Sequence, residues 1–143
     1  MSEVRFIVPG RVAGKGRPRF DPRSGRAYTD KKTKSAEEIV KFYAAAAMGS
    51  EKPFTGPLTV AIEIHYNTPK SWTKAARADA WHVTGSAFPD LDNVVKTVLD
   101  SCNGVVFEDD AQICTIFAGR RYKDKDEEHV DIRVFTPGTG WHL

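Results

Sequence analysis

The order of apolar patterns along this chain predicts a single α+β domain, with a mixed β-sheet and helices mainly on one face of that sheet. Strand-like alternation occurs near both ends of the chain, and helical patterns lie between the alternating segments. No linker or internal repeat divides the 143 residues. A chain of this length buries about two-thirds of the surface that its unfolded form exposes, so one hydrophobic core is sufficient without a disulfide framework. We therefore expect one domain over residues 1–143.

The first part of the chain, residues 1–36, is expected to form a strand followed by a basic arm. Apolar and polar residues alternate over residues 3–8, which predicts a strand that the Pro-Gly pair at residues 9–10 ends. Residues 9–27 are rich in glycine, proline and arginine and show no periodicity, which indicates a basic loop. A loose hairpin around residues 24–25 is the regular structure expected within this loop.

The middle of the chain predicts a helix, a strand and a second helix. Thr33 or Ser35 is a candidate N-cap for a helix that runs to about Met48. The alternation of residues 58–65 predicts a strand with one solvated face. Residues 70–82 have a helical pattern and are expected to form the next element.

The clearest helical pattern covers residues 90–103. Its apolar residues recur at spacings of three and four, and polar residues run down the opposite face. Gly104 is expected to end this helix. Two further strands are expected over residues 111–121 and 128–135, with a charged turn between them. The residues of the apolar stripe are Leu91, Val94, Val95, Val98, Leu99 and Cys102.

Basic residues are concentrated at the start of the chain. Residues 1–36 contain ten lysines and arginines and three acidic residues, a net charge of +7. The rest of the chain carries eleven basic and sixteen acidic residues, a net charge of −5. This asymmetry predicts an anionic partner for the basic part. A solvated basic loop without a ligand explains the same composition equally well.

Four aspartates give the strongest chemical signal. Asp90 and Asp92 flank the start of the predicted helix, and Asp109 and Asp110 follow it after a chain reversal that returns toward it. Closely packed carboxylates repel one another, and a divalent cation such as Mg²⁺, which prefers oxygen ligands, relieves the repulsion. Lys96, one turn after Asp92, is placed to stabilise charge on a phosphate. In the structural alternative, Asp90 caps the helix, Asp92 pairs with Lys96, and the later acids form a solvated turn.

The basic arm predicts a contact with nucleic acid. Lys15, Arg17 and Arg19 are expected to contact backbone phosphates, and Phe20 or Tyr28 is expected to stack on an exposed base. The alternative is a solvated loop with one aromatic side chain in the core. Because the arm contains no base-reading motif, its binding is expected to be largely independent of sequence.

The rest of the composition limits where the protein works. No run of eighteen apolar residues occurs, so neither a transmembrane helix nor a membrane partner is expected. The first residues lack the basic and then apolar pattern of a secretory signal. Cys102 and Cys114 fit neither a zinc set nor a disulfide framework and are expected to be small core residues. We therefore expect a cytoplasmic protein.

Two motifs resemble those of the RusA family of Holliday junction resolvases. The first is Asp-Leu-Asp-Asn-Val-Val-Lys at residues 90–96, and the second is Asp-Asp-Ala-Gln at residues 109–112. The basic arm at residues 14–20 is also similar to many members. The resemblance is densest over residues 88–112, which we treat as an acidic catalytic segment.

The resemblance implies a homodimeric α+β endonuclease that uses Mg²⁺, for which Mn²⁺ can substitute, to cut four-way DNA junctions symmetrically. Carried over by motif, Asp90, Asp92 and Asp110 are the catalytic and metal-binding acids, and Lys96 is a catalytic lysine. Asp109 is an alternative to Asp110, because the spacing between the two motifs varies by one residue. A two-fold dimer presents two identical sites, which matches the two equivalent phosphates of a junction.

Two other functions stay open on the sequence. A non-catalytic module that binds branched DNA would use the acids as helix caps and show no metal-dependent turnover. A nuclease that prefers flaps or forks would use the same residues on a different substrate. The small size of the chain is compatible with a phage or prophage origin.

Overall fold

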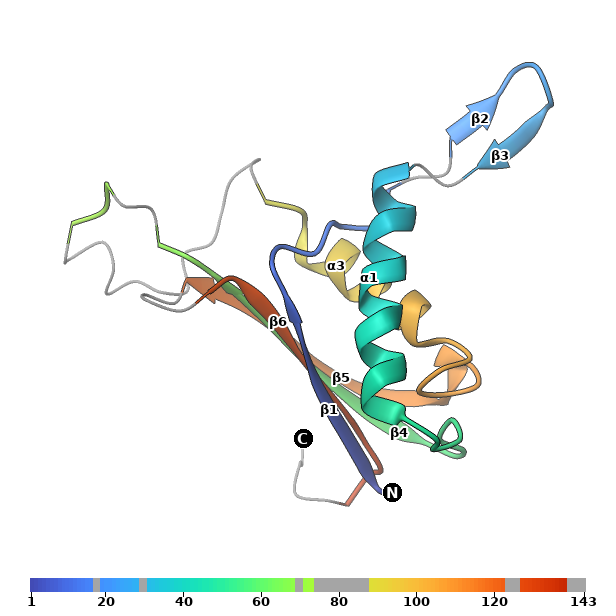
Figure 1. Cartoon of the computed structure of the whole chain (residues 1–143), viewed down its shortest axis with the longest axis vertical. Helices are drawn as coiled ribbons and strands as arrows, with labels where there is room; N and C mark the ends of the chain where they lie inside the picture. The colour runs from blue at the N-terminus through green and yellow to red at the C-terminus, as the bar shows by residue number, and fades with distance from the viewer. Residues whose placement is uncertain (17–18, 29–30, 69–70, 74–87, 123–126, 139–143) are drawn as a thin grey trace.

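The computed structural model confirms the α+β class with a mixed sheet (Figure 1). The structure describes residues 1–16, 19–28, 31–68, 71–73, 88–122 and 127–138. The strands of the main sheet are β1 (Glu3–Pro9), β4 (Leu58–Tyr66), β5 (Ile113–Tyr122) and β6 (His129–Phe135). They lie in the order β1-β6-β4-β5.

Strand direction makes this sheet mixed. β6 pairs antiparallel with both β1 and β4, whereas β5 pairs parallel with β4. A parallel pair needs a long connection, because the chain must return to the same end of the sheet. The connection between β4 and β5 contains the helix α3 (Leu91–Cys102), which carries the acidic motif. The parallel edge of the sheet therefore positions the candidate site.

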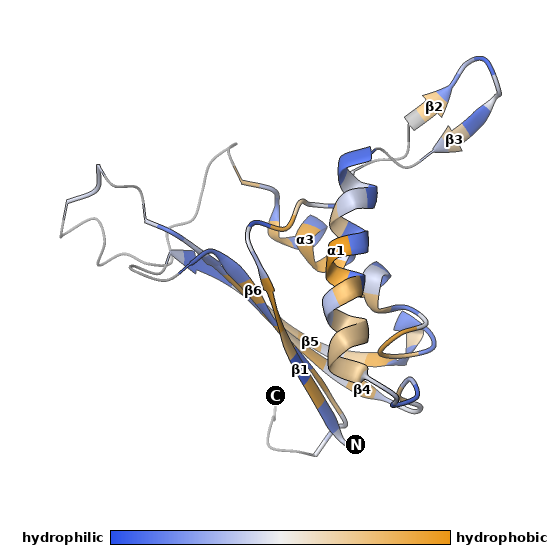
Figure 2. Cartoon of the chain, in the orientation of Figure 1, coloured by the Kyte–Doolittle hydropathy of each residue, from blue (hydrophilic) through white to orange (hydrophobic). Residues whose placement is uncertain are grey.

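The helices α1 (Lys31–Met48) and α3 pack against each other and lie on the same side of the sheet in Figure 1. β1 shows why one face of the sheet is covered: Val4, Phe6 and Val8 are buried, and the residues between them are exposed. Figure 2 shows the same alternation of hydrophobic and hydrophilic residues along β1. None of the described helices is long and apolar enough to cross a membrane. The buried residues that the helices add to the core include Val40, Ala44, Met48, Val94, Val98 and Cys102.

The predicted hairpin forms a separate two-stranded sheet. β2 (Arg19–Asp21) pairs antiparallel with β3 (Arg26–Tyr28). Gly25 has φ 69° in the turn between them, a conformation that glycine adopts without strain. In Figure 1 the hairpin projects beyond the N-terminal end of α1. Phe20 and Tyr28 are both exposed, so neither aromatic side chain lies in the core.

Two element boundaries differ from the predictions by two residues or more. α1 begins at Lys31, before either predicted cap, so Thr33 lies inside the helix, where its side chain is buried. The Thr33 hydroxyl oxygen accepts a hydrogen bond from the backbone N–H of Gly16 at 2.9 Å. β5 begins at Ile113, two residues later than predicted, because a short 3₁₀ helix, η1 (Asp110–Gln112), precedes it.

The two cysteines lie in different environments. Cys102 is buried as predicted, and burial raises the pKa of its thiol to about 12. The prediction for Cys114 is wrong, because this residue is exposed on the edge strand β5. Most of the helix predicted over residues 70–82 lies outside the described residues. Trp72 packs against Tyr122, with ring centroids 4.5 Å apart.

Candidate functional site

Asp90 and Asp92 are exposed at the N-terminal end of α3. Asp90 is the N-cap residue, and its carbonyl oxygen accepts hydrogen bonds from the backbone N–H groups of Asn93 and Val94. The Asp90 side chain makes no capping hydrogen bond, so the alternative in which this carboxylate caps the helix is wrong. The backbone before it is fixed from β5, where the guanidinium of Arg120 donates to the carbonyl of Pro89 at 2.6 Å. The helix therefore presents two carboxylates to solvent on a fixed backbone.

The start of the basic arm is fastened to the first turns of α3. The backbone N–H of Lys15 donates to the carbonyl of Asn93 at 2.9 Å, and the Thr97 hydroxyl donates to the carbonyl of Ala13 at 3.0 Å. A Cβ atom at Gly14 would lie 2.8 Å from the Cβ of Pro89, so only glycine allows this approach. Residues 12–16, which we call the fastened loop, are therefore held against α3 and form one wall of the site.

The side chain of Lys15 joins three parts of the fold. Its Nζ lies 2.6 Å from a carboxylate oxygen of Glu37 on α1 and 3.0 Å from one of Asp100 on α3. The hydrogen bonds to Glu37 and then Asp100 raise the pKa of Lys15. Of the other two predicted DNA-binding residues, Arg19 lies in β2, and Arg17 lies outside the described residues. The structure thus places Lys15 beside the acidic helix, with its charge already paired.

The second acidic motif is held by Gln112. Asp109 is the N-cap of η1, and its carboxylate accepts a hydrogen bond from the backbone N–H of Ala111 at 2.9 Å. The Gln112 side-chain oxygen accepts from the N–H groups of Glu108 and Asp109 at 3.0 and 3.1 Å. Its side-chain nitrogen donates to the carbonyls of Phe54 and Gly56 at 2.9 and 3.0 Å. One side chain therefore fixes the acidic turn to the segment before β4.

Asp110 lies in an acidic environment that the sequence did not reveal. A hydrogen bond with Asp109 raises the pKa of Asp110, with smaller contributions from burial and from the negative charges of Asp109 and Asp100. Asp100 therefore links the ion pairs of Lys15 to the second acidic motif. Asp100 lies on the polar face of α3 and is exposed. Its ion pair with a residue 85 positions earlier is a tertiary contact that no local pattern encodes.

The predicted metal-binding acids do not form a closed cage. Across the part of the chain that the structure describes, no group of three or more His, Cys, Asp or Glu side chains is placed to hold a metal ion. Asp90, Asp92 and Asp110 are therefore not brought to one point. The donor set still fits Mg²⁺ in kind, because this ion is usually bound by one or two carboxylates together with waters and substrate phosphates. Asp92, Lys96 and Asp100 follow one another at intervals of four residues along the exposed side of α3.

A cavity of about 460 Å³ lies between the fastened loop and the first turn of α3. Its lining includes the basic residues Arg11, Lys15 and Lys32, together with Phe88 and Asn93. The Arg11 guanidinium lies 4.5 Å from the centre of the Phe88 ring, which gives a cation–π contact. The residues immediately before Asp90 thus border a cavity with three basic residues in its lining, of which Arg11 and Lys15 are paired with acidic side chains.

A known protein family matches a region of the sequence that includes the residues of this site. The profile of a family described as "Endodeoxyribonuclease RusA" matches residues 9–134. The chain belongs to the RusA endodeoxyribonuclease family. The match includes the fastened basic loop, α3 and the second acidic motif. RusA membership supports a nuclease that hydrolyses phosphodiester bonds in DNA, with Holliday junctions as the substrate at the level of the family.

A curated relative matches over nearly its whole length. The protein named "Uncharacterized protein YqaN" from Bacillus subtilis (strain 168) is 29% identical over 140 residues. The aligned region covers 93% of this chain and 97% of that protein. The two chains are therefore similar in extent as well as in sequence.

Two residues of the site were missed by sequence reasoning. Gln112 belongs to the second acidic motif, where it anchors the turn and holds no predicted role in catalysis or binding. An Asp followed three residues later by Gln is the pattern of a capping box, and Asp109 with Gln112 forms one. Arg11 gave no comparable local signal. Its guanidinium donates two hydrogen bonds, of 3.1 and 2.6 Å, to the carboxylate of Glu128, which lies 117 residues later in the chain.

Proposed function

We propose that this protein is a divalent-metal-dependent endonuclease that resolves four-way DNA junctions by paired symmetric cuts, acting as a homodimer. The observation that carries the proposal is the exposed pair Asp90 and Asp92, whose backbone is fixed and whose N-cap carboxylate makes no capping hydrogen bond. Membership of the RusA family supplies the reaction class and the substrate class. Symmetric cutting follows from two identical sites acting on two equivalent phosphates.

Asp90, Asp92 and Asp110 are the residues that would hold the cation. When bound, a divalent cation supplies charge stabilisation at the phosphate and lowers the pKa of an attacking water. The side chain of Asp109 is already used to cap η1, which favours Asp110 over Asp109 as the third acid. The DNA phosphate, itself an oxygen ligand, would complete the coordination.

The remaining residues bind and orient the DNA. Lys96 lies one turn after Asp92 on the exposed side of α3 and would stabilise negative charge on the phosphate. We assign backbone contacts to Lys15, Arg17 and Arg19, with the basic cavity beside α3 as a neighbouring contact surface. Preference for branched DNA would come from its shape, because the basic surfaces of two protomers fit that geometry together.

The experiment uses labelled four-way junction, flap and linear duplex, each with Mg²⁺ and with EDTA. We expect paired cuts on the junction with Mg²⁺, and loss of cleavage but retained binding in Asp92→Asn. Glu38→Gln is the matched control, because it converts an exposed acid on α1 to an amide and is expected to leave cleavage unchanged. Junction binding without cleavage under any divalent metal would overturn the nuclease proposal in favour of a binding module.

Two further variants separate the adjacent acids of the second motif. Asp110→Asn is expected to abolish cleavage, whereas Asp109→Asn is expected to retain most of it, because asparagine also caps helices. The reverse result would assign the third acid to Asp109. Preferential cutting of the flap would replace the junction with a flap as the substrate and would leave the reaction class intact.

A further inference from the structure

Two arginine side chains contact the residues just before Asp90. From β5, a guanidinium nitrogen of Arg120 donates a hydrogen bond of 2.6 Å to the carbonyl oxygen of Pro89. From the segment after β1, the guanidinium of Arg11 lies 4.5 Å from the centre of the Phe88 ring. The two residues that precede the first acid of the site are therefore each held by a contact from a different part of the fold.

The contact of Arg120 reaches Asp90 through the geometry of the peptide bond. The carbonyl group of Pro89 lies in one plane with the backbone nitrogen and Cα of Asp90, because the C–N bond has partial double-bond character. A hydrogen bond to the Pro89 oxygen therefore restricts the rotation of that whole plane. On the other side of Asp90, its own carbonyl accepts hydrogen bonds from the N–H groups of Asn93 and Val94. With both neighbouring planes held, the Cα–Cβ bond of Asp90 has a fixed direction.

The two acids at the start of α3 differ in what fixes their direction. Asp92 lies in the first turn of the helix, so the helical backbone sets the direction of its side chain. Asp90 is the N-cap residue, which has extended dihedral angles, and its side chain makes no capping hydrogen bond. Helical geometry alone therefore does not set the direction of Asp90. The position of its carboxylate relative to that of Asp92 depends on the contact from β5.

Arg120 is itself placed to make a lasting contact. Its backbone belongs to β5 and pairs with Ile64 in the register of β4 and β5. The hydrogen bond to Pro89 is part-buried. A charged donor makes a shorter and stronger hydrogen bond than a neutral one, and partial burial strengthens it further. The sheet thus holds the start of the helix through one side chain.

Aromatic rings hold the chain one residue earlier. The ring centroid of Phe88 lies 4.5 Å from that of Tyr66 and 5.8 Å from that of Tyr122. Burial raises the pKa of Tyr66, and the positive charges of Arg120 and Arg11 counteract part of that effect. Both guanidinium groups therefore lie near the same buried ring, which joins the two contacts into one packed cluster.

We infer that Arg120 is a positioning residue of the site, which sets the direction of the Asp90 carboxylate relative to Asp92 by holding the peptide plane before it. The inference rests on the proposed function, in which these two acids hold the cation. Arg120 acts on the backbone, and its hydrogen bond is made without substrate. A misplacement of about 1 Å can cost about 100-fold in the rate of a reaction. Loss of Arg120 is therefore expected to slow cleavage without weakening the binding of DNA.

NMR relaxation of the isotope-labelled, metal-free protein measures the positioning directly. The N–H of Asp90 lies in the peptide plane that Arg120 holds, so its order parameter reports the motion of that plane. We expect an order parameter of about 0.85 in the wild type, as in rigid backbone, and a fall toward about 0.6 in Arg120→Met. Arg120→Lys keeps a cationic donor and is expected to give a value between these two.

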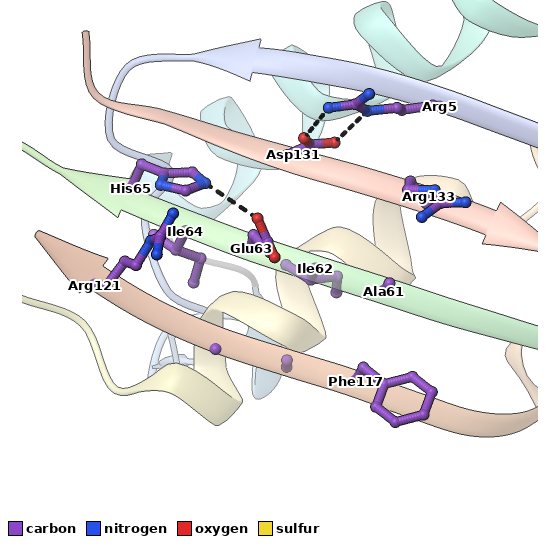
Figure 3. Close-up of a pocket in the computed structure, with 12 residues that line it drawn as sticks. Arg5, Ala61, Ile62, Glu63, Ile64, His65, Phe117, Arg121, Asp131 and Arg133 are labelled. Carbon is purple, nitrogen blue, oxygen red and sulfur yellow. Dashed lines mark hydrogen bonds and ion pairs between the residues drawn. The ribbon is translucent and has the colours of Figure 1, made fainter. Parts of the chain in front are cut away.

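Arg121→Met is the matched control. Arg121 is the next residue of β5 and pairs with His65 in the register of β4 and β5. Its side chain therefore points to the other face of the sheet, where Figure 3 shows it near His65. The variant removes the same charge from the same strand and leaves the contact with Pro89 in place. It is expected to change neither the order parameter of Asp90 nor the rate of cleavage.

Single-turnover cleavage of the four-way junction measures the consequence for the reaction. Arg120→Met is expected to cut at least about tenfold more slowly than the wild type with Mg²⁺. Its binding to the junction in EDTA is expected to equal that of the wild type, and Arg120→Lys is expected to retain more of the rate. Circular dichroism of each variant confirms that the fold is retained. Should Arg120→Met fail to fold, Arg120→Lys carries the same comparison, with a smaller fall in both quantities.

The outcomes separate this inference from the proposed function. An unchanged order parameter of Asp90 in Arg120→Met would overturn the inference, and so would a lower order parameter with an unchanged rate of cleavage. Weaker junction binding in EDTA with an unchanged order parameter would make Arg120 a DNA contact instead. A wild-type protein that does not cut DNA, together with a lower order parameter in Arg120→Met, would overturn the proposed function and leave the backbone contact established.

Discussion

Gly14→Ala tests the contact that fastens the basic loop to the acidic helix. The added Cβ would lie 2.8 Å from the Cβ of Pro89 and 3.0 Å from the Cβ of Asn93, whereas ordinary contacts begin at 3.4 Å. The loop and helix must therefore separate by about 0.6 Å at the closer contact, since 3.4 minus 2.8 is 0.6. Cβ atoms cannot rotate away, so the backbone must move. This movement also stretches the 2.9 Å hydrogen bond from Lys15 N–H to the carbonyl of Asn93.

The expected loss of stability follows from two opposing effects. Overpacking costs about 1 to 3 kcal/mol, and replacing glycine with alanine returns about 0.4 to 1 kcal/mol by restricting the unfolded chain. The free energy of unfolding should therefore fall by about 1 to 2 kcal/mol, which lowers Tm by roughly 3 to 8 °C for a chain of this size. Urea unfolding followed by circular dichroism measures the change, with an unchanged m-value.

Pro89→Gly provides the control for this experiment. It removes the nearer of the two colliding Cβ atoms, so Gly14→Ala should cost less in the Pro89→Gly background than in the wild type. The double-mutant cycle isolates that coupling from the separate cost of the new glycine. A loss below about 0.5 kcal/mol in the wild-type background, within the range of ordinary surface substitutions, would refute the close packing of loop and helix.

Three further predictions follow from the site. Lys15→Met should lower stability, because it leaves Glu37 and Asp100 without their shared cation, and should also reduce the salt slope of junction binding by about 0.9, the value for one lost phosphate contact, as measured by salt titration of binding. Asp110→Asn should raise Tm at neutral pH, because folding raises the pKa of Asp110 and the folded protein therefore loses stability as pH rises through that pKa and the carboxyl ionises. Below the ordinary pKa of 3.8 the carboxyl is protonated in both states, so the Tm difference between the variant and the wild type should vanish there in thermal melts. Gln112→Met, which removes four hydrogen bonds, should lower the free energy of unfolding by about 2 kcal/mol or more in urea titration and reduce cleavage, whereas an unchanged stability would contradict its anchoring role.

Local patterns were sufficient to predict most elements of the fold. The spacing of Val94 and Val98 predicted α3, and both side chains are fully buried on the core side of that helix. Alternation predicted β1 and the position of β4, and a glycine in the turn predicted the hairpin of β2 and β3. The solvated face expected for β4 is wrong, because every residue of this strand except Glu63 is buried. The start of α1 was missed because Thr33, a candidate N-cap, lies inside the helix, where its hydroxyl accepts a part-buried hydrogen bond from the backbone N–H of Gly16 in a distant loop.

The candidate site was predicted only in its local parts. The sequence identified the exposed pair Asp90 and Asp92, because their position at a helix start follows from the adjacent periodicity. It did not predict that Lys15 is paired with Glu37 and Asp100, because those contacts join residues that are far apart in the chain.

The sequence by itself determined the type of the described α-helices and β-strands, the concentration of basic residues before α1 and the two acidic motifs, because each of these properties depends on neighbours within a few residues. Only the tertiary structure decided that β5 runs parallel to β4 at the edge of the sheet and that the basic loop is fastened to α3. It also decided which acids share an environment and which face of the sheet is left open. The same alternation of side chains along each strand is compatible with several strand orders. The free energy of the whole core selects among those orders, so the local pattern cannot specify which strands pair.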